Sequence, residues 1–167
     1  MKRLLLKRNV SMSKTPLGEL LAPITLSRPE KKRKMDETLV EEFLSELRET
    51  GVEILDEGRR GNHFRLEQGK TGVEVSLHGS TDWGWWGVAE NYVKKAGKWG
   101  DHWGVVFLTP KERFWVIGRN FRTIVTGDLD EANGYNVHLD RLKGSSSANR
   151  FSSVSEFLSI SGLRSLP

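Results

Sequence analysis

The sequence contains no cysteine among its 167 residues. This absence excludes disulfide bonds, thiolate zinc sites and nucleophilic catalysis by sulfur, and it fits a reducing compartment. Long hydrophobic runs are missing too: the basic N-terminus holds only three consecutive leucines, at positions 4–6. That run is too short for a signal peptide or a membrane span. We therefore expect an intracellular protein of the cytoplasm or nucleus, without a membrane partner.

Several catalytic signatures are also missing. The sequence has no Gly-x-Ser-x-Gly elbow, no Walker phosphate loop and no dinucleotide-binding glycine fingerprint. No sequence motif therefore supports a function as a serine hydrolase, an ATPase or a dehydrogenase. The histidines lack the HxH or HxxxH spacing that would mark a metal site by itself. They are His63, His78, His102 and His138.

Positive charge is distributed unevenly along the chain. Residues 1–35 contain ten Lys or Arg and two Glu, although the whole chain has a formal net charge of only +4. Such a segment is typical either of a flexible arm that contacts a polyanion or of a solubilising leader. Its run EKKRK could also act as a nuclear localisation signal. We expect a basic N-terminal arm over residues 1–35 and a single folded domain over residues 36–167.

Hydrophobic periodicity predicts how the folded domain begins. Apolar residues recur at i, i+3, i+4 and i+7 from Val40 to Leu47, and this pattern predicts a helix that ends near Gly51. Three short segments follow and are separated by glycine-containing turns, which is typical of a three-stranded meander. These segments cover residues 52–58, 61–69 and 71–79.

The second half of the domain predicts another helix and more strands. Apolar residues return at helical spacing over residues 86–98, and a nearly continuous apolar run over 102–109 predicts a strand covered on both faces. A further strand is expected over 113–121, and a final short helix is expected to be capped by Ser152 or Ser153. The predicted fold is α+β, with a mixed central sheet of about five strands flanked by helices.

This order of elements resembles the core of the PD-(D/E)xK nuclease superfamily, which includes restriction enzymes, homing endonucleases and junction resolvases. The stretch HFRLEQGKTGVEVS is similar to the family's strand pair, in which an aspartate precedes a turn and Glu-x-Lys follows it. Here Glu74 matches the glutamate, Ser76 replaces the lysine, and segment 63–65 lacks the aspartate. The resemblance covers about residues 36–120 and implies a restriction-endonuclease-like fold.

The resemblance also implies Mg²⁺-dependent DNA cleavage, often by a homodimer. Such chemistry needs at least two hard oxygen ligands near the metal and a cation to support the attacking water. On this interpretation Glu74 and Asp56 hold the metal, and Glu37 is another candidate for the second acid. Lys94 replaces the missing lysine, because some family members carry that lysine on the following helix.

Each of these residues also has a plainer explanation. Glu74 could point outward from a half-exposed strand, and Glu37 could simply interact with the helix dipole. Asp56 could be an ordinary turn residue. Lys94 could form a surface ion pair with Glu90, four residues before it.

Tryptophan is concentrated in one stretch. Five of the six tryptophans lie between positions 83 and 103. Trp103, like Trp115 further along, is flanked by strand residues and is expected in the core. The glycines of DWGWWG favour an exposed loop that carries Trp83, Trp85 and Trp86. Burial of all five rings is the alternative.

A basic surface is expected next to this loop. Residues 91–122 contain seven Lys or Arg against two acids, whereas residues 36–57 contain nine acids and one Arg. Rings beside a basic surface can stack on unpaired bases or wedge into a duplex, although Trp and Arg also anchor protein interfaces. The expected nucleic-acid contacts are Arg59, Arg60, Trp83, Trp85, Trp86, Lys95 and Lys98.

The sequence thus leaves three functions open. The first is a DNA-acting protein with a nuclease-like core that cleaves phosphodiesters with Mg²⁺. The second is a non-catalytic module of the same fold that binds nucleic acid or a protein. The third is a structural protein of a virus or mobile element, for which only the basic arm would contact nucleic acid.

Overall fold

The computed structural model describes residues 37–56, 62–80, 84–127 and 133–163. All of them belong to the compact unit Lys34–Pro167. The predicted α+β class is confirmed, because helices accompany a mixed six-stranded sheet and a second, two-stranded sheet. None of the helices in this part of the chain is long and apolar enough to span a bilayer.

The main sheet has the spatial order β1-β2-β3-β5-β6-β8. Its strands are β1 (Glu53–Asp56), β2 (His63–Gln68), β3 (Thr71–Gly79), β5 (Trp103–Leu108), β6 (Arg113–Ile117) and β8 (Asn149–Phe151). Neighbouring strands are antiparallel except for β3 and β5, which run parallel. The second sheet pairs β4 (Trp85–Ala89) with β7 (Gly134–His138) in antiparallel orientation. The predicted sheet of about five strands thus gains a sixth, β8.

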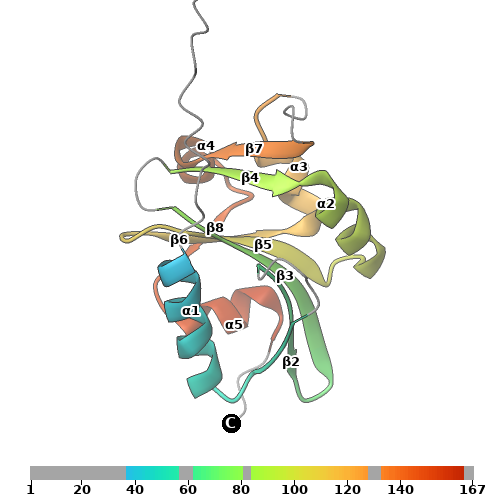
Figure 1. Ribbon diagram of the computed structural model, residues 1–167, viewed down its shortest axis with the longest axis vertical. Coiled ribbons are helices and arrows are strands. Elements are labelled where there is room, and N and C mark those ends of the chain that lie inside the picture. The colour runs from blue at the N-terminus through green and yellow to red at the C-terminus, as the bar shows by residue number, and fades with distance from the viewer. Residues whose placement is uncertain (1–36, 57–61, 81–83, 128–132, 164–167) are drawn as a thin grey trace, which may run out of the picture. The chain divides into compact units, whose positions relative to one another are not determined.

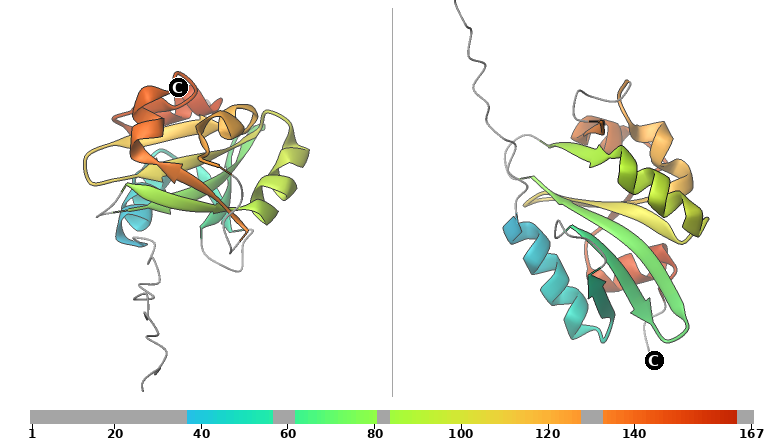
Figure 2. Two further views of the ribbon diagram at one scale, coloured as in Figure 1. Left: turned by 90° about the horizontal axis from the view of Figure 1, so that it is seen from above. Right: turned by 45° about the vertical axis from the view of Figure 1, so that its right-hand side comes forward.

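Helices cover both faces of the main sheet. The α-helices are α1 (Glu37–Glu49), α2 (Glu90–Ala96), α3 (Phe121–Ile124), α4 (Leu139–Gly144) and α5 (Val154–Ser161), and the 3-10 helices are η1 (Gly97–Trp99) and η2 (Gly118–Asn120). Figure 1 and the right-hand view of Figure 2 show α1 and α5 on one side of the sheet, with β4, β7 and α2 on the other. The central strands are therefore buried on both faces.

Two hydrophobic clusters correspond to these two sides. The first joins the apolar side of α1 to α5 and to one face of β3, where Val73, Val75 and Leu77 lie. The second fills the space between β5, β6 and the β4–β7 pair. All six residues of β5 are buried, which confirms the prediction of a strand covered on both faces. Because strand side chains alternate, the even-numbered residues of β3 face the second side.

Most predicted elements are confirmed, but two have wrong bounds. The strand predicted over 113–121 ends at Ile117, because the chain turns there into η2 and α3. Helix α1 buries the four apolar residues that predicted it, and Ser153 caps α5 by accepting a hydrogen bond from the Glu156 backbone N–H at 3.2 Å. The predicted helix over 86–98 is wrong at its start, because 85–89 form β4 and α2 begins only at Glu90. Strand β4 forms there because its backbone pairs with β7, a partner nearly 50 residues later in the chain.

Candidate nucleic-acid interface

A row of polar side chains lies on the second face of β3, on the side of the sheet where β4, β7 and α2 lie (Figure 1). We call Glu74, Ser76 and His78 the polar row; all three are buried. Their shared face is the one expected from strand alternation. The suggestion that Glu74 points outward from a half-exposed strand is therefore wrong. A buried carboxylate needs a partner, and the neighbouring strand supplies one.

Arg65 on β2 is the cationic neighbour of the polar row. It stands opposite Glu74 in the β2–β3 register, and its Nη1 lies 3.5 Å from Glu74 Oε1. Its Nε also donates a hydrogen bond to Glu67 Oε1 on the same strand. One guanidinium thus interacts with two carboxylates, and this offsets part of the cost of burying Glu74. Sequence reasoning noted Arg65 only as a position without aspartate.

Ser76 and His78 form a closed pair inside the protein. Ser76 Oγ and His78 Nε2 lie 2.7 Å apart. Burial, with a smaller contribution from nearby His63, lowers the pKa of His78 to about 3. His78 is therefore neutral at physiological pH. Ser76 has no exposed surface and His78 is buried, so this hydrogen bond lies inside the protein.

Tyr92 fixes α2 over the polar row. Its ring centroid lies 4.4 Å from that of His63 on β2, and its hydroxyl donates a 3.0 Å hydrogen bond to the Gly104 carbonyl. Burial, and then the negative charge of Glu74, raises the pKa of Tyr92 well above its ordinary value. The pKa of His63 is lowered by burial and then by the charge of Lys95. Lys95, rather than Lys94, is therefore the lysine whose charge reaches this cluster.

Among the predicted catalytic residues, the structure separates Glu37 from Glu74. Glu37 is the exposed first residue of α1, the helix on the other side of the sheet from Glu74. Lys94 forms a 2.9 Å ion pair with Glu90, which confirms the surface-pair alternative. Asp56 ends β1, but its side chain is outside the description. Arg59 and Arg60 also lie outside the described residues.

The described residues do not fit a magnesium site. Among them, no group of three or more His, Asp or Glu side chains is placed to hold a metal ion. The cation beside the Glu74 carboxylate is the guanidinium of Arg65. Magnesium needs several oxygen ligands in near-octahedral geometry, and a carboxylate engaged by arginine is a poor start for such a set. No cleavage step can therefore be derived from these side chains.

The tryptophans divide differently from the prediction. Trp85 and Trp86 lie in strand β4, so the predicted loop is wrong for both. Trp86 is buried, 5.1 Å from the ring of Phe107, and half-buried Trp85 meets His138 edge-on. Trp83 lies outside the described residues. Trp103 and Trp115 are buried, as predicted.

Trp99 is the exposed ring that sequence reasoning missed. It ends η1 and is 42% exposed. The guanidinium carbon of Arg65 lies 4.3 Å from its ring centroid, in cation–π geometry. Lys94, Lys95 and Lys98 are exposed on the same continuous helical segment. We call Lys94, Lys95, Lys98 and Trp99 the basic face; the signal in the sequence was the stretch KKAGKW.

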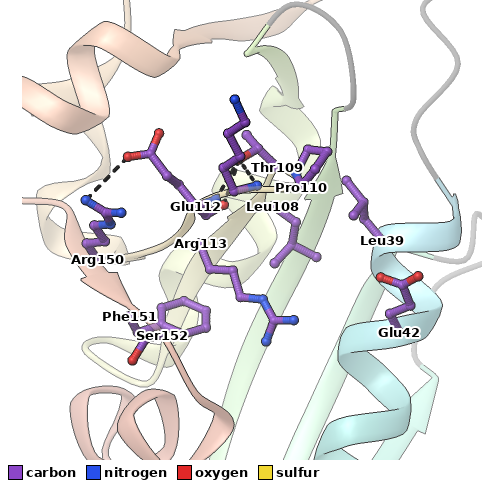
Figure 3. Close-up of a pocket in the computed structure, with 11 residues that line it drawn as sticks. Leu39, Glu42, Leu108, Thr109, Pro110, Glu112, Arg113, Arg150, Phe151 and Ser152 are labelled. Carbon is purple, nitrogen blue, oxygen red and sulfur yellow. Dashed lines mark hydrogen bonds and ion pairs between the residues drawn. The ribbon is translucent and has the colours of Figure 1, made fainter.

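A cavity of about 500 Å³ lies elsewhere, between α1, the β5–β6 turn and β8 (Figure 3). Its charged groups are largely paired within the protein. Arg113 donates two 2.6 Å hydrogen bonds to the Glu46 carboxylate, and Glu112 interacts with Lys143 at 2.7 Å and Arg150 at 3.5 Å. These pairs join α1 to β6 and join the β5–β6 turn to α4 and β8, so the ion pairs around the cavity connect elements of the fold.

Replacing Glu46 by glutamine is expected to destabilise the protein at pH 7 by about 1 kcal/mol, the upper range for a partly exposed pair. The hydrogen bond from Arg113 lowers the pKa of Glu46, so the pair's contribution is present above pH 4.5 and is lost as pH falls through the lower folded value. Urea denaturation at pH 7 and pH 3 measures this. Glu41→Gln, which removes the longer 3.9 Å pair with Arg48 on the same helix, is the control. Equal effects of the two variants at pH 7 would contradict the assignment.

No protein-family model matches the chain. No curated protein matches its sequence either.

Proposed function

We propose that this protein acts on DNA as a non-catalytic binding module, and that the basic face is its contact surface. The observation that carries the proposal is the exposed indole of Trp99 beside the exposed ammonium groups of Lys95 and Lys98. Lysines supply the salt-dependent attraction to phosphates, and an exposed aromatic ring supplies a surface for bases. Both features lie on one short segment, α2 and η1.

The electrostatics of this segment favour an anionic partner. Lys94 is paired with Glu90, whereas the structure shows no carboxylate within ion-pair distance of Lys95 or Lys98 among the described residues. The guanidinium of Arg65 lies over the Trp99 ring, but Glu67 and Glu74 offset its charge, so the attraction to an anion comes from Lys95 and Lys98. Phosphate contacts of this kind position a nucleic acid without reading its sequence. Affinity should therefore depend strongly on salt and weakly on sequence.

The order of elements supports a nuclease-like core for this module. Helix α1, strands β1 to β3, helix α2 and strand β5 follow one another, with β4 inserted before α2 and with β5 parallel to β3. This is the order on which the resemblance to the PD-(D/E)xK superfamily rests. Magnesium-dependent cleavage and a homodimer stay predictions. We favour binding over cleavage because Arg65 engages the Glu74 carboxylate.

Removing two lysines from the basic face tests the proposal. The double variant Lys95→Ala, Lys98→Ala is expected to weaken DNA binding by the full chain about tenfold at physiological salt. The slope of log K against log salt should become shallower by about 1 to 2 units, as for the loss of two phosphate contacts. Fluorescence anisotropy with labelled oligonucleotides at several salt concentrations measures both.

A matched double variant removes the same charge elsewhere. Lys70→Ala with Lys111→Ala changes two exposed lysines in the β2–β3 and β5–β6 turns and should have a clearly smaller effect. Equal losses of DNA affinity in the two double variants would mean that only the net charge of the protein matters. The basic face would then not be the contact surface. The N-terminal arm is present in every variant, so its contribution cancels.

The same samples test the cleavage prediction. Binding is expected to persist in EDTA, and supercoiled plasmid is expected to stay intact with and without Mg²⁺. Nicking that requires Mg²⁺ and disappears in Glu74→Gln would overturn the non-catalytic assignment and support Glu74 as a metal ligand.

A further inference from the structure

The contact between Trp99 and Arg65 indicates which kind of nucleic acid the basic face prefers, whereas the lysines indicate only an anionic ligand. Arg65 covers one face of the indole with its guanidinium carbon 4.3 Å from the centroid. The residue nevertheless keeps 42% of its surface exposed. The part of the indole that Arg65 does not cover is therefore the part that a ligand can reach. A flat aromatic face in solvent, backed by a cation, is the surface on which another ring can stack.

Arg65 is itself held in place. Its side chain is only 23% exposed, and Glu67 on β2 and Glu74 on β3 both engage its guanidinium. The indole thus rests on a group that is anchored to two strands of the central sheet. A preorganised ring loses less conformational freedom on binding than a free surface side chain. Arg65 acts as a positioning residue for Trp99, and Glu74 helps to hold Arg65 in place under the ring.

We propose that Trp99 is a stacking platform for an unpaired base, so that the preferred ligand of the basic face is single-stranded DNA. This inference rests on the proposed function and narrows its ligand. A duplex exposes only base edges in its grooves. Every unpaired base, whatever its identity, exposes a ring face on which the indole can stack. Lys95 and Lys98 lie within four residues of Trp99 and supply charges for the phosphates beside the stacked base.

The test compares two ligands on the full-length protein. Fluorescence anisotropy gives the affinities for a labelled 12-nucleotide single strand and for the same sequence as a duplex. The wild type is expected to prefer the single strand about tenfold or more. Trp99→Ala is expected to remove most of this preference. Trp99→Phe, which keeps an aromatic ring, should retain a large part of it.

An abasic single strand provides a readout that needs no variant. It keeps every phosphate but lacks the bases at its central positions. The wild type is expected to bind it about tenfold more weakly than the intact strand, with an unchanged salt slope. Trp99→Ala should bind both strands with similar affinity. The comparison of intact and abasic strands on the wild type tests the inference even if Trp99→Ala is unstable.

The two proposals fail in different ways. Equal binding of intact and abasic strands by the wild type would overturn the platform and leave the basic face as a phosphate-binding surface. A loss in Trp99→Ala that is as large on the duplex as on the single strand would indicate a wedge into duplex DNA and would also overturn it. If the double variant Lys95→Ala, Lys98→Ala binds every ligand with the affinity of the wild type, the proposed function itself is overturned.

Discussion

Gly104→Ala is expected to destabilise the protein by about 3 kcal/mol or more, the upper range for overpacking a well-filled core. Gly104 lies in β5, between β3 and β6. A Cβ there would overlap the indole of Trp115 and the carbonyl oxygen of Val116, both closer than any real Cβ contact. Neither neighbour can give way easily, because the oxygen is backbone and Trp115 is only 1% exposed.

Backbone pairing prevents β5 from moving away from this overlap. Gly104 is registered with Val75 on the parallel side and with Ile117 on the antiparallel side. Its carbonyl also accepts the hydrogen bond from Tyr92 that fixes α2. The substitution should therefore lower the melting temperature by roughly 10 °C, given about 3 °C per kcal/mol for a domain of this size. Thermal unfolding followed by circular dichroism measures the shift.

Gly87→Ala is the matched control for this prediction. Gly87 is also a strand glycine, in β4, but it is exposed and a Cβ there would meet nothing within 4 Å. Its replacement should change stability by no more than about 0.5 kcal/mol. Similar melting temperatures for the two variants would show that β5 and Trp115 can repack, which would contradict the close-packing argument.

The second large effect is expected in mild acid. The pKa of His78 falls from 6.5 to about 3 on folding, mainly because the side chain is buried. Between these two values the unfolded chain binds a proton that the folded protein does not, so stability falls as pH falls. The slope is about 1.4 kcal/mol per pH unit, so a change from pH 6.5 to pH 5 should cost about 2 kcal/mol. His63, whose pKa is also lowered, adds a loss of the same sign.

His78→Gln identifies the group responsible. Glutamine can keep a hydrogen bond to Ser76 but does not titrate, so the variant should lose much less stability between pH 6.5 and pH 5. Urea denaturation at intervals of half a pH unit measures the slope, and this window lies above the titration of most carboxyl groups. His102→Gln removes an exposed histidine and serves as the control. A wild-type slope in His78→Gln would assign the acid sensitivity to another group.

Local patterns were sufficient wherever a residue's surroundings follow from its own segment. The i, i+3, i+4, i+7 repeat located α1, and the continuous apolar run located β5. Strand alternation is enough to place Glu74, Ser76 and His78 on one face of β3. Whether this polar face is covered as well depends on the elements packed on the second side of the sheet, and alternation carries no information about that. The burial of Glu74 was missed for this reason.

The tryptophans show the same limit. Glycines around Trp85 and Trp86 favoured a loop, but pairing with β7 made this stretch a strand and buried Trp86. In the sequence, nothing distinguishes Trp99 from the other tryptophans between positions 83 and 103. Its exposure and its contact with Arg65 result from the packing of η1. Composition and periodicity by themselves determined the α+β class, the order of most elements and the basic character of residues 91–122. Tertiary structure alone decided which polar and aromatic side chains are covered, because burial depends on contacts between segments that are distant in the chain.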